Sequence, residues 1–219
     1  WRVTRPLLVL GAPRSGRSTL VASAATAALG SGRGVHLCGF APPTTIASDQ
    51  TTDMACPVRG PLSHPRLGTV GGTEDPRRLT RLWGLAASGH LGGDLLCLDN
   101  VDALVPTIDE VLGPGQGNAL LEAVIRTASA TGTPLLLTAP LAASTSRWAA
   151  SMGLRLVLGA ATGTQAALAG LPRGVVTGGA PGRGVVLDGA TTTACQIVLR
   201  EDCPGSACAR DGARALRLE

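Results

Sequence analysis

The chain has 219 residues, of which 44% are hydrophobic and 16% are charged. This balance suits one compact domain that mixes helices and strands, and it excludes a disordered or collagen-like polymer. Aromatic residues make up only 2% of the chain, which excludes a stacking surface for single-stranded nucleic acid. The formal net charge of +4 permits a polyanionic partner without requiring one.

All 19 basic residues are arginine, and the absence of Lys and Tyr indicates a GC-rich genome. The chain begins with Trp1, so we interpret it as a fragment of a longer protein. It has no apolar run of the roughly eighteen residues that a membrane-spanning helix needs, and we expect it to be soluble. The six cysteines form no C-x-x-C pair, which indicates reduced thiols in a cytosolic protein. Oxidation of Cys203 with Cys208 is the alternative.

Short apolar runs alternate with segments of helical periodicity along most of the chain. Buried strands are predicted at residues 6–10, 34–40, 68–70, 95–98, 134–138 and 154–158. Helices are predicted at residues 18–29, after Asp75-Pro76, from about 118 to 129, near 144–151 and at 164–169. Such alternation is typical of a mostly parallel sheet with helices on both faces.

Two segments depart from this alternation. Residues 41–65 are rich in Pro and Thr and lack periodicity, which predicts a long surface loop. The runs at 185–187 and 194–199 lie at hairpin distance, so the sheet is predicted to end in antiparallel strands. We expect one domain over residues 1–199 and a charged tail or linker over residues 200–219.

Residues 11–18 match the phosphate-loop pattern G-x-x-x-x-G-K-[ST] at every fixed position except the lysine, which is Arg17. The glycines of such a loop allow backbone N–H groups to face phosphate oxygens, and the following helix presents its positive end. An ordinary Gly/Ser turn is the alternative, but the strand before the loop and the helix after it favour nucleotide binding. The expected contacts with the nucleotide are Gly11, Ala12, Pro13, Arg14, Ser15, Gly16, Arg17, Ser18 and Thr19.

Four apolar residues at 95–98 are followed by Asp99, which is the form of a Walker B strand. Its carboxylate is predicted to face the phosphate loop across the strand tips and to hold Mg²⁺ together with Ser18. An acid that merely caps the strand is the alternative. The next residue is Asn100, where hydrolysing enzymes of this type usually carry a glutamate that orients the attacking water.

Three other polar residues give weaker indications. Thr138 ends the next strand, where related ATPases keep a polar residue that senses the γ-phosphate. Arg147 and Arg173 are candidate fingers for the site of a neighbouring subunit, and solvated surface arginines are the alternative. The three histidines lack the spacing of metal ligands.

These motifs, together with the closing pattern Leu171-Pro172…Pro181-Gly182-Arg183-Gly184, resemble the FtsK/SpoIIIE family of RecA-like ATPases over residues 7–198. Within that family the chain is most similar to the C-terminal ATPase module of the membrane-anchored, EccC-type motor of actinobacterial type VII secretion. The resemblance implies a RecA-like P-loop NTPase fold of the α/β class. It also implies ATP or ADP with Mg²⁺ as the ligands.

Arg17 and Asn100 depart from the family pattern at the two positions that hydrolysis needs most. A guanidinium is a wide planar fork where the loop expects a slim point charge. We therefore expect a degenerate module that hydrolyses ATP poorly or not at all and serves nucleotide-dependent assembly, regulation or substrate capture. An active DNA translocase and a nucleotide-free scaffold are the alternatives.

The resemblance also implies the partners and the location of the chain. It implies neighbouring ATPase modules, in a hexamer of the full-length protein, and the signal peptide of a secreted substrate. It places the fragment on the cytoplasmic side of the inner membrane. DNA is the less favoured partner, because the arginines are scattered along the chain and nearly balanced by 15 acidic residues.

Overall fold

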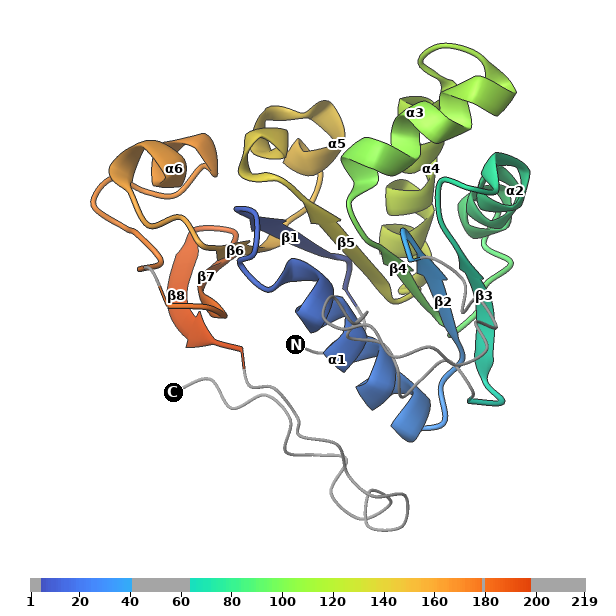
Figure 1. The fold of residues 1–219 in the computed structure, drawn as a ribbon, viewed down its shortest axis with the longest axis horizontal. Coiled ribbons are helices and arrows are strands. Elements are labelled where there is room, and N and C mark those ends of the chain that lie inside the picture. The colour runs from blue at the N-terminus through green and yellow to red at the C-terminus, as the bar shows by residue number, and fades with distance from the viewer. Residues whose placement is uncertain (1–4, 41–63, 179, 198–219) are drawn as a thin grey trace, which may run out of the picture.

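The computed structural model describes residues 5–40, 64–178 and 180–197. Its centre is an eight-stranded sheet with the order β3-β2-β4-β5-β1-β6-β7-β8 (Figure 1). The strands are β1 Leu7–Gly11, β2 Val35–Cys38, β3 Leu67–Gly71, β4 Leu95–Leu98, β5 Leu135–Ala139, β6 Leu154–Leu158, β7 Arg183–Asp188 and β8 Thr191–Gln196. The pairs from β3 to β6 are parallel, and β7 is antiparallel to both β6 and β8. The predicted α/β class with antiparallel closing strands is confirmed.

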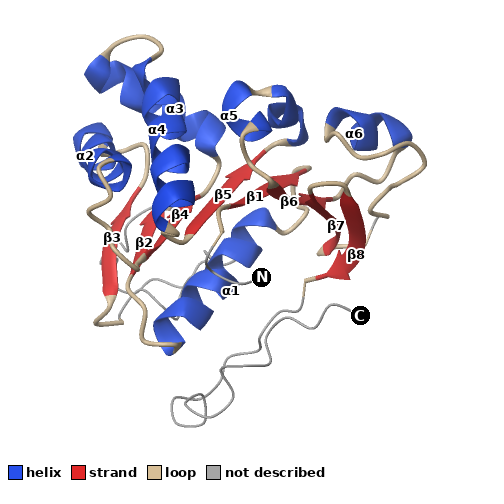
Figure 2. Cartoon of the chain, turned by 180° about the vertical axis from the view of Figure 1, so that it is seen from behind, coloured by secondary structure: helices blue, strands red, loops and turns tan. Residues whose placement is uncertain are grey.

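Helices cover both faces of the sheet, as predicted, but they are divided unequally. The helices are α1 Arg17–Gly30, α2 Pro76–Ala87, α3 Val101–Leu112, α4 Gln116–Thr131, α5 Arg147–Ala150 and α6 Gly163–Leu168, with a 3-10 helix, η2, at Leu141–Thr145. Helix α1 lies on one side of the sheet, and α2 to α6 lie on the other (Figures 1 and 2).

The side chains of β1 alternate between these two layers. Leu7 and Val9 join the apolar cluster beneath α1, whereas Leu8 and Leu10 join the cluster beneath the other helices. All four are buried, because β1 lies in the interior of the sheet with a helical layer on each side. A strand in this position is apolar at every residue, which is the pattern that the sequence has here.

Helix α2 begins where the sequence predicts it. The Asp75 side chain accepts a 3.0 Å hydrogen bond from the backbone N–H of Arg78, and Pro76 occupies the first turn. The buried face of α2 carries Trp83, which is fully enclosed. This side chain is therefore part of the core, as is Trp148 in α5.

Helix α3 lies between β4 and the turn at Gly113, where no element is predicted from the sequence. Pro106 lies inside this helix and cannot donate a hydrogen bond to the carbonyl four residues earlier, a feature that normally ends or kinks a helix. The apolar spacing of the helix is nevertheless regular. Its buried side chains at helical spacing are Val101, Leu104, Val105 and Ile108.

The closing hairpin is largely as predicted. Strand β8 begins at Thr191 rather than at residue 194, and residues 198 and 199 lie outside the described part.

Cys38 and Cys97 are buried free thiols in β2 and β4. The loop predicted over 41–65 lies outside the described residues up to position 63, and so do the predicted tail and the Cys203–Cys208 pair. Among the described helices, none has the length and apolar character needed to cross a membrane.

Candidate nucleotide site

The predicted phosphate loop connects β1 to α1 at the carboxyl edge of the sheet. Arg14 and Gly16 have φ values of 60° and 98°, and left-handed residues of this kind turn successive N–H groups into a concave surface. The N–H of Ala12 donates to the carbonyl of Leu158 at 3.2 Å, so this group fastens the loop to β6. Pro13 is exposed at the outer side of the loop.

Ser15 is enclosed between the ends of two strands. Ser15 is 6% exposed, and its Oγ atom has no hydrogen-bond partner. A Cβ atom on Gly11 would clash with Ser15 Oγ, and one on Gly159 would lie 2.8 Å from Ser15 Cβ. Glycine is therefore required on both sides of this serine.

The first turn of α1 has no side-chain cap. Gly16 is the N-cap residue and has no side chain to accept a hydrogen bond, and the first turn contains no acidic residue. The first N–H groups of a helix have no partner within the helix, so those of residues 17–19 remain for an external acceptor. Together with the positive end of the helix dipole, they favour an anion at this point.

Arg17 folds back over the loop. Its Cγ and Cδ atoms would lie 2.8 Å and 3.0 Å from a Cβ atom on Gly11, which shows that the aliphatic part of the side chain runs across the end of β1. Its Nη1 atom is buried and has no hydrogen-bond partner. A buried N–H donor without an acceptor destabilises a fold by about 1–3 kcal/mol. The loop therefore contains a cationic donor that lacks an acceptor.

Asp99 follows β4 and is held by residues of two other elements. Ser18 Oγ donates to Asp99 Oδ2 at 2.6 Å, and Thr138 Oγ1 donates to Asp99 Oδ1. The residue is 7% exposed. Strand β5 lies between β1 and β4, so Thr138 on β5 is placed beside both Asp99 and the start of α1. Three sequence-predicted residues are thus brought together.

Asn100 adopts a left-handed backbone with a φ value of 57° and is the N-cap residue of α3. Its side chain makes no capping hydrogen bond and is exposed. Its backbone N–H donates to Thr138 Oγ1 at 2.8 Å. This residue therefore contributes to the site through its backbone.

Asp102, in the first turn of α3, lies near the site and was not predicted from the sequence. Burial raises the pKa of its carboxyl, and the positive charge of Arg17 opposes this increase. The start of α3 therefore places an acid within electrostatic range of the phosphate loop. Asp102 stands three positions after Asp99 and belongs to no motif, so the sequence carried little signal for it.

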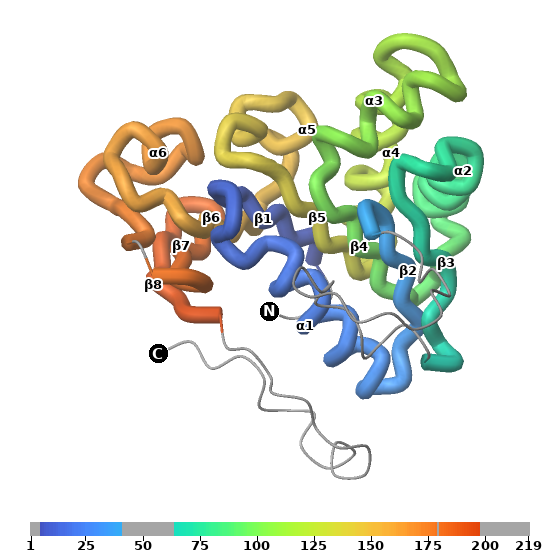
Figure 3. The backbone as a smooth tube through the Cα atoms, in the orientation of Figure 1, coloured from blue at the N-terminus to red at the C-terminus, as the bar shows by residue number. Residues whose placement is uncertain are grey.

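A second loop adjoins the phosphate loop. A Cβ atom on Gly16 would lie 4.0 Å from the backbone nitrogen of Gly182, in the segment that leads into β7. In Figure 3 the turn from β1 into α1 lies next to the chain that enters β7. The N–H of Ile197 donates to the carbonyl of Gly182 at 2.8 Å and fixes this loop to the end of β8. The closing Pro-Gly-Arg-Gly pattern therefore borders the site.

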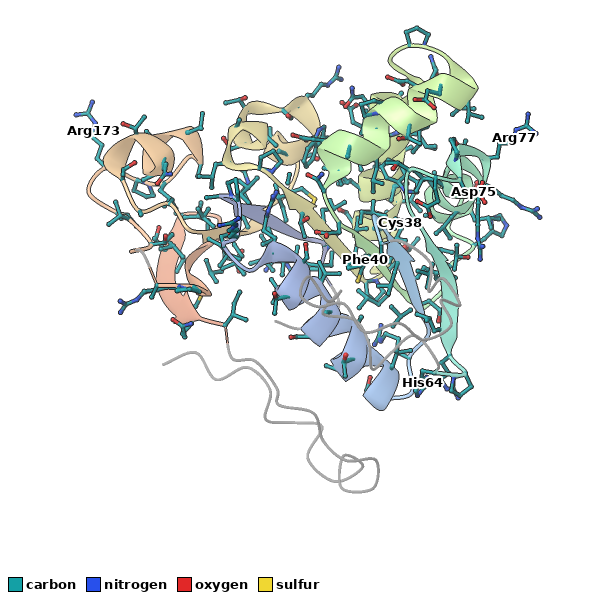
Figure 4. All side chains as sticks on the ribbon, viewed as in Figure 1. Cys38, Phe40, His64, Asp75, Arg77 and Arg173 are labelled. Atoms are coloured by element: carbon teal, nitrogen blue, oxygen red, sulfur yellow. The ribbon has the colours of Figure 1, made fainter. Side chains whose placement is uncertain are left out.

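The two candidate finger residues lie elsewhere. Arg147 is largely exposed, and its Nε atom lies 3.6 Å from Glu122 Oε1. Arg173 follows α6 and points outward at the end of the molecule opposite α2, on which Arg77 points outward in the other direction (Figure 4). Neither is placed at the phosphate loop of its own chain.

The residues of the site suit a phosphate group accompanied by a metal ion. Ser18 and Asp99 provide the hydroxyl and carboxylate oxygens that Mg²⁺ prefers. No group of three His, Cys, Asp or Glu residues gathers anywhere in the described ranges, so further ligands would come from water or phosphate. Ser15 Oγ and Arg17 Nη1 are buried polar atoms that lack partners, and phosphate oxygens are suitable acceptors for both.

A separate hollow lies at the opposite edge of the sheet. It has a volume of about 190 Å³ and is lined by residues next to the amino ends of β1 and β6, including Arg5 and Met152, and by Ser129 of α4. This hollow is distinct from the phosphate loop, which lies at the carboxyl ends of the same strands.

No family model and no curated protein matches the sequence. Solved structures do resemble the fold. The cytoplasmic domain of the type VII secretion ATPase EccC from Thermomonospora curvata has a TM-score of 0.55 at 13% identity, over 91% of this chain and 24% of that one. A structure of ATPases 2 and 3 of the same EccC with a signal sequence peptide has a TM-score of 0.55 at 15% identity, over 91% of this chain and 38% of that one.

The cytoplasmic domain of EssC also resembles this chain, with a TM-score of 0.52 at 10% identity, over 87% of this chain and 37% of that one. These likenesses show that the chain shares the fold of the solved ATPase domains. The chain thus spans between about a quarter and two-fifths of the length of these solved chains.

Proposed function

We propose that this chain is a P-loop ATPase module that binds ATP or ADP with Mg²⁺ and hydrolyses ATP poorly or not at all. The observation that carries the proposal is the pair of buried, unpartnered polar atoms at the phosphate loop, Ser15 Oγ and Arg17 Nη1. They lie in a strand-loop-helix motif whose helix start is uncapped. An anion would satisfy both atoms and the helix N–H groups together.

Each residue of the site has a distinct task when nucleotide is present. The N–H groups at the start of α1 and the Arg17 guanidinium bind phosphate oxygens. Ser18 Oγ and Asp99 hold the metal ion, which neutralises phosphate charge. Thr138 orients the Asp99 carboxylate through its hydroxyl and ties it to the backbone of Asn100. The nucleotide is thus held by groups from α1, β4 and β5.

We expect slow hydrolysis because of the residues at two positions, 100 and 17. Asn100 places an exposed amide, rather than a carboxylate, after the Walker B strand, and an amide cannot take a proton from water. Arg17 binds phosphate through a broad, planar guanidinium, where the phosphate-loop pattern has the compact ammonium of a lysine. Loss of a water-orienting or general-base residue typically removes about 10²–10⁴-fold of the rate.

The proposed setting is a membrane-anchored motor of the FtsK/SpoIIIE type that serves type VII-like secretion, on the cytoplasmic side of the membrane. Its partners are neighbouring ATPase modules, in a hexamer of the full-length protein, and the signal peptide of a secreted substrate. The fold similarity to EccC supports this setting, and one of the EccC structures contains a signal sequence peptide.

The role within the motor is nucleotide-dependent assembly, regulation or substrate capture. A DNA translocase is the second candidate, and a nucleotide-free scaffold is the third. The unpartnered donors at the loop favour nucleotide binding over the scaffold.

The decisive experiment measures nucleotide binding and turnover on the purified 219-residue chain. ADP with Mg²⁺ at a hundred times its dissociation constant should stabilise the fold by about 2.7 kcal/mol, visible as an increase in Tm. Phosphate release from ATP should stay far below the rate of about 1 per second that active kinases reach. The absence of a Tm shift at millimolar nucleotide would establish the scaffold instead.

A second measurement separates the secretion and DNA candidates. Binding of a secretion-signal peptide and of duplex DNA is compared at low and moderate salt. We expect peptide binding that changes little with salt. Tight DNA binding that weakens steeply with salt, without peptide binding, would favour the translocase.

A further inference from the structure

Arg14 has a backbone conformation that an arginine rarely adopts. It lies in the middle of the phosphate loop, between Pro13 and Ser15, and has a φ value of 60°. This left-handed region is unfavourable for a residue with a Cβ atom, because that atom comes close to the following carbonyl oxygen. Glycine adopts the same backbone without strain. The path of the loop alone would therefore favour glycine at position 14.

The packing of the fold does not require an arginine at this position. The Arg14 side chain is exposed and belongs to neither apolar cluster. Within residues 5–40, 64–178 and 180–197, its guanidinium takes part in no hydrogen bond and no ion pair. Strained residues of this kind occur mainly at functional sites. The identity of residue 14 therefore indicates a contact that the isolated chain does not make.

The rest of the loop shows what this contact would be. Ser15, the next residue, is buried and its Oγ atom has no partner, and Arg17 Nη1 is buried in the same condition. The first turn of α1 has no side-chain cap. These groups await an anion at the loop, and a guanidinium pairs well with phosphate oxygens. Arg14 is attached to this loop, so its long side chain starts beside the same anion.

We propose that the Arg14 guanidinium binds the phosphate groups of the nucleotide from the exposed rim of the loop, and that the strained backbone is maintained for this contact. The inference rests on the proposed function and adds a residue to it. The phosphate-loop pattern uses this position through its backbone N–H groups. In this chain the loop carries two guanidinium groups, Arg17 inside it and Arg14 at its rim, in place of one ammonium.

Isothermal titration calorimetry with ADP and Mg²⁺ tests the contact in the 219-residue chain and in two variants, Arg14→Ala and Arg14→Gly. Both variants should bind ADP about fivefold more weakly, which is the upper range for an ion pair that remains in contact with solvent. Affinities within about twofold of the parent would overturn the contact and leave the proposed function standing. If the parent chain itself does not bind ADP, the proposed function fails, so the two failures are distinguishable.

Thermal unfolding of the ligand-free proteins tests the strain. Arg14→Ala keeps a Cβ atom at this position, so its Tm should stay close to that of the parent chain. Arg14→Gly relieves the backbone, and its Tm should be about 2–4 °C higher. The glycine variant would then be more stable and yet bind ADP more weakly, which a purely structural role of Arg14 does not produce. A Tm of the glycine variant at or below that of the alanine variant would overturn the argument from strain.

Salt and a matched substitution separate a direct contact from an effect of net charge. The difference in affinity between the parent chain and Arg14→Ala should narrow between about 50 mM and about 500 mM NaCl, because an exposed pair is screened. Arg126→Ala removes the same charge from an exposed position on α4 and should leave ADP binding unchanged. A loss in this control as large as that in Arg14→Ala would overturn the assignment to Arg14.

Discussion

Ser18 and Asp99 are joined by a 2.6 Å hydrogen bond although 81 positions separate them in the chain. The bond connects the first turn of α1 to the end of β4, which are the two elements that would hold a metal ion between them. Thr138 donates to the other oxygen of the same carboxylate. The carboxylate is therefore oriented toward α1 before any ligand arrives.

Asp99→Asn should weaken Mg²⁺-dependent nucleotide binding at least tenfold and lower the free energy of unfolding by about 1–3 kcal/mol. The amide nitrogen cannot accept a hydrogen bond, so one of the two hydroxyl donors loses its acceptor. Titration calorimetry with and without EDTA, together with urea denaturation, measures both effects. Unchanged binding with Mg²⁺ would contradict a metal-holding role for Asp99.

Asn100→Glu should not produce rapid hydrolysis, and it should destabilise the fold by about 1–2 kcal/mol. The left-handed backbone at this position is costly for a residue with a long side chain. Asn100→Gly is the control and should be neutral or mildly stabilising, because glycine adopts this backbone without strain. Urea denaturation and phosphate release measure the two properties. Equal stability of the Glu and Gly variants would contradict the backbone argument.

Gly11→Ala should disrupt the phosphate loop. The added methyl group would clash with Ser15 Oγ and press on Arg17 Cγ, and overpacking of this kind typically costs about 1–3 kcal/mol. Gly84→Ala in α2 is the matched control. Its Cβ atom would meet no other atom within 4 Å, so helix propensity should stabilise the fold by about 0.5–1 kcal/mol. Opposite changes in Tm are expected, and a loss in both variants would contradict the steric argument.

The stability of the fold should fall as the pH decreases below 6.5, because of His36. Burial lowers the pKa of this side chain from its ordinary value of 6.5, and the nearby Asp94 carboxylate only partly opposes the effect. Its Nδ1 atom accepts a 3.0 Å hydrogen bond from the backbone N–H of Thr69, which requires the neutral ring. The unfolded chain takes up this proton at a higher pH than the folded chain, so acid favours unfolding.

His36→Gln provides the test of this pH dependence. Glutamine retains a hydrogen-bond acceptor but does not titrate. Urea denaturation between about pH 7.5 and pH 5 should show a smaller loss of stability in the variant than in the parent chain. An identical pH profile would assign the loss to other groups.

The sequence predicted the sheet well because its interior strands are apolar on both faces. Strands β1, β4 and β5 were readable for this reason, and the Asp75 cap marked the start of α2. The early start of β8 was missed because Thr191 is polar, as suits an exposed edge strand. Helix α3 was missed because Pro106 concealed its apolar periodicity.

Those parts of the site that are defined by the spacing of residues along the sequence were predictable. The phosphate loop and the acid after β4 are local patterns, and the parallel sheet brings them together. Gly159 and Asp102 could not be predicted in this way. Gly159 matters because β6 pairs with β1 and brings it against Ser15, and Asp102 matters because α3 begins near Arg17. Both relationships depend on which elements become neighbours.

The strand order of the sheet determines when each strand can pair during folding. Strand β1 precedes the other described strands in the chain, yet its two partners are β5 and β6, and Leu7 is aligned with Leu136 and Leu154. The phosphate-loop strand thus stays without a partner until most of the domain has left the ribosome. Long-range parallel pairing of this kind is slow. Among the described strands, β1 therefore waits longest for a partner, and its apolar segment from Leu7 to Leu10 is exposed to aggregation in the meantime.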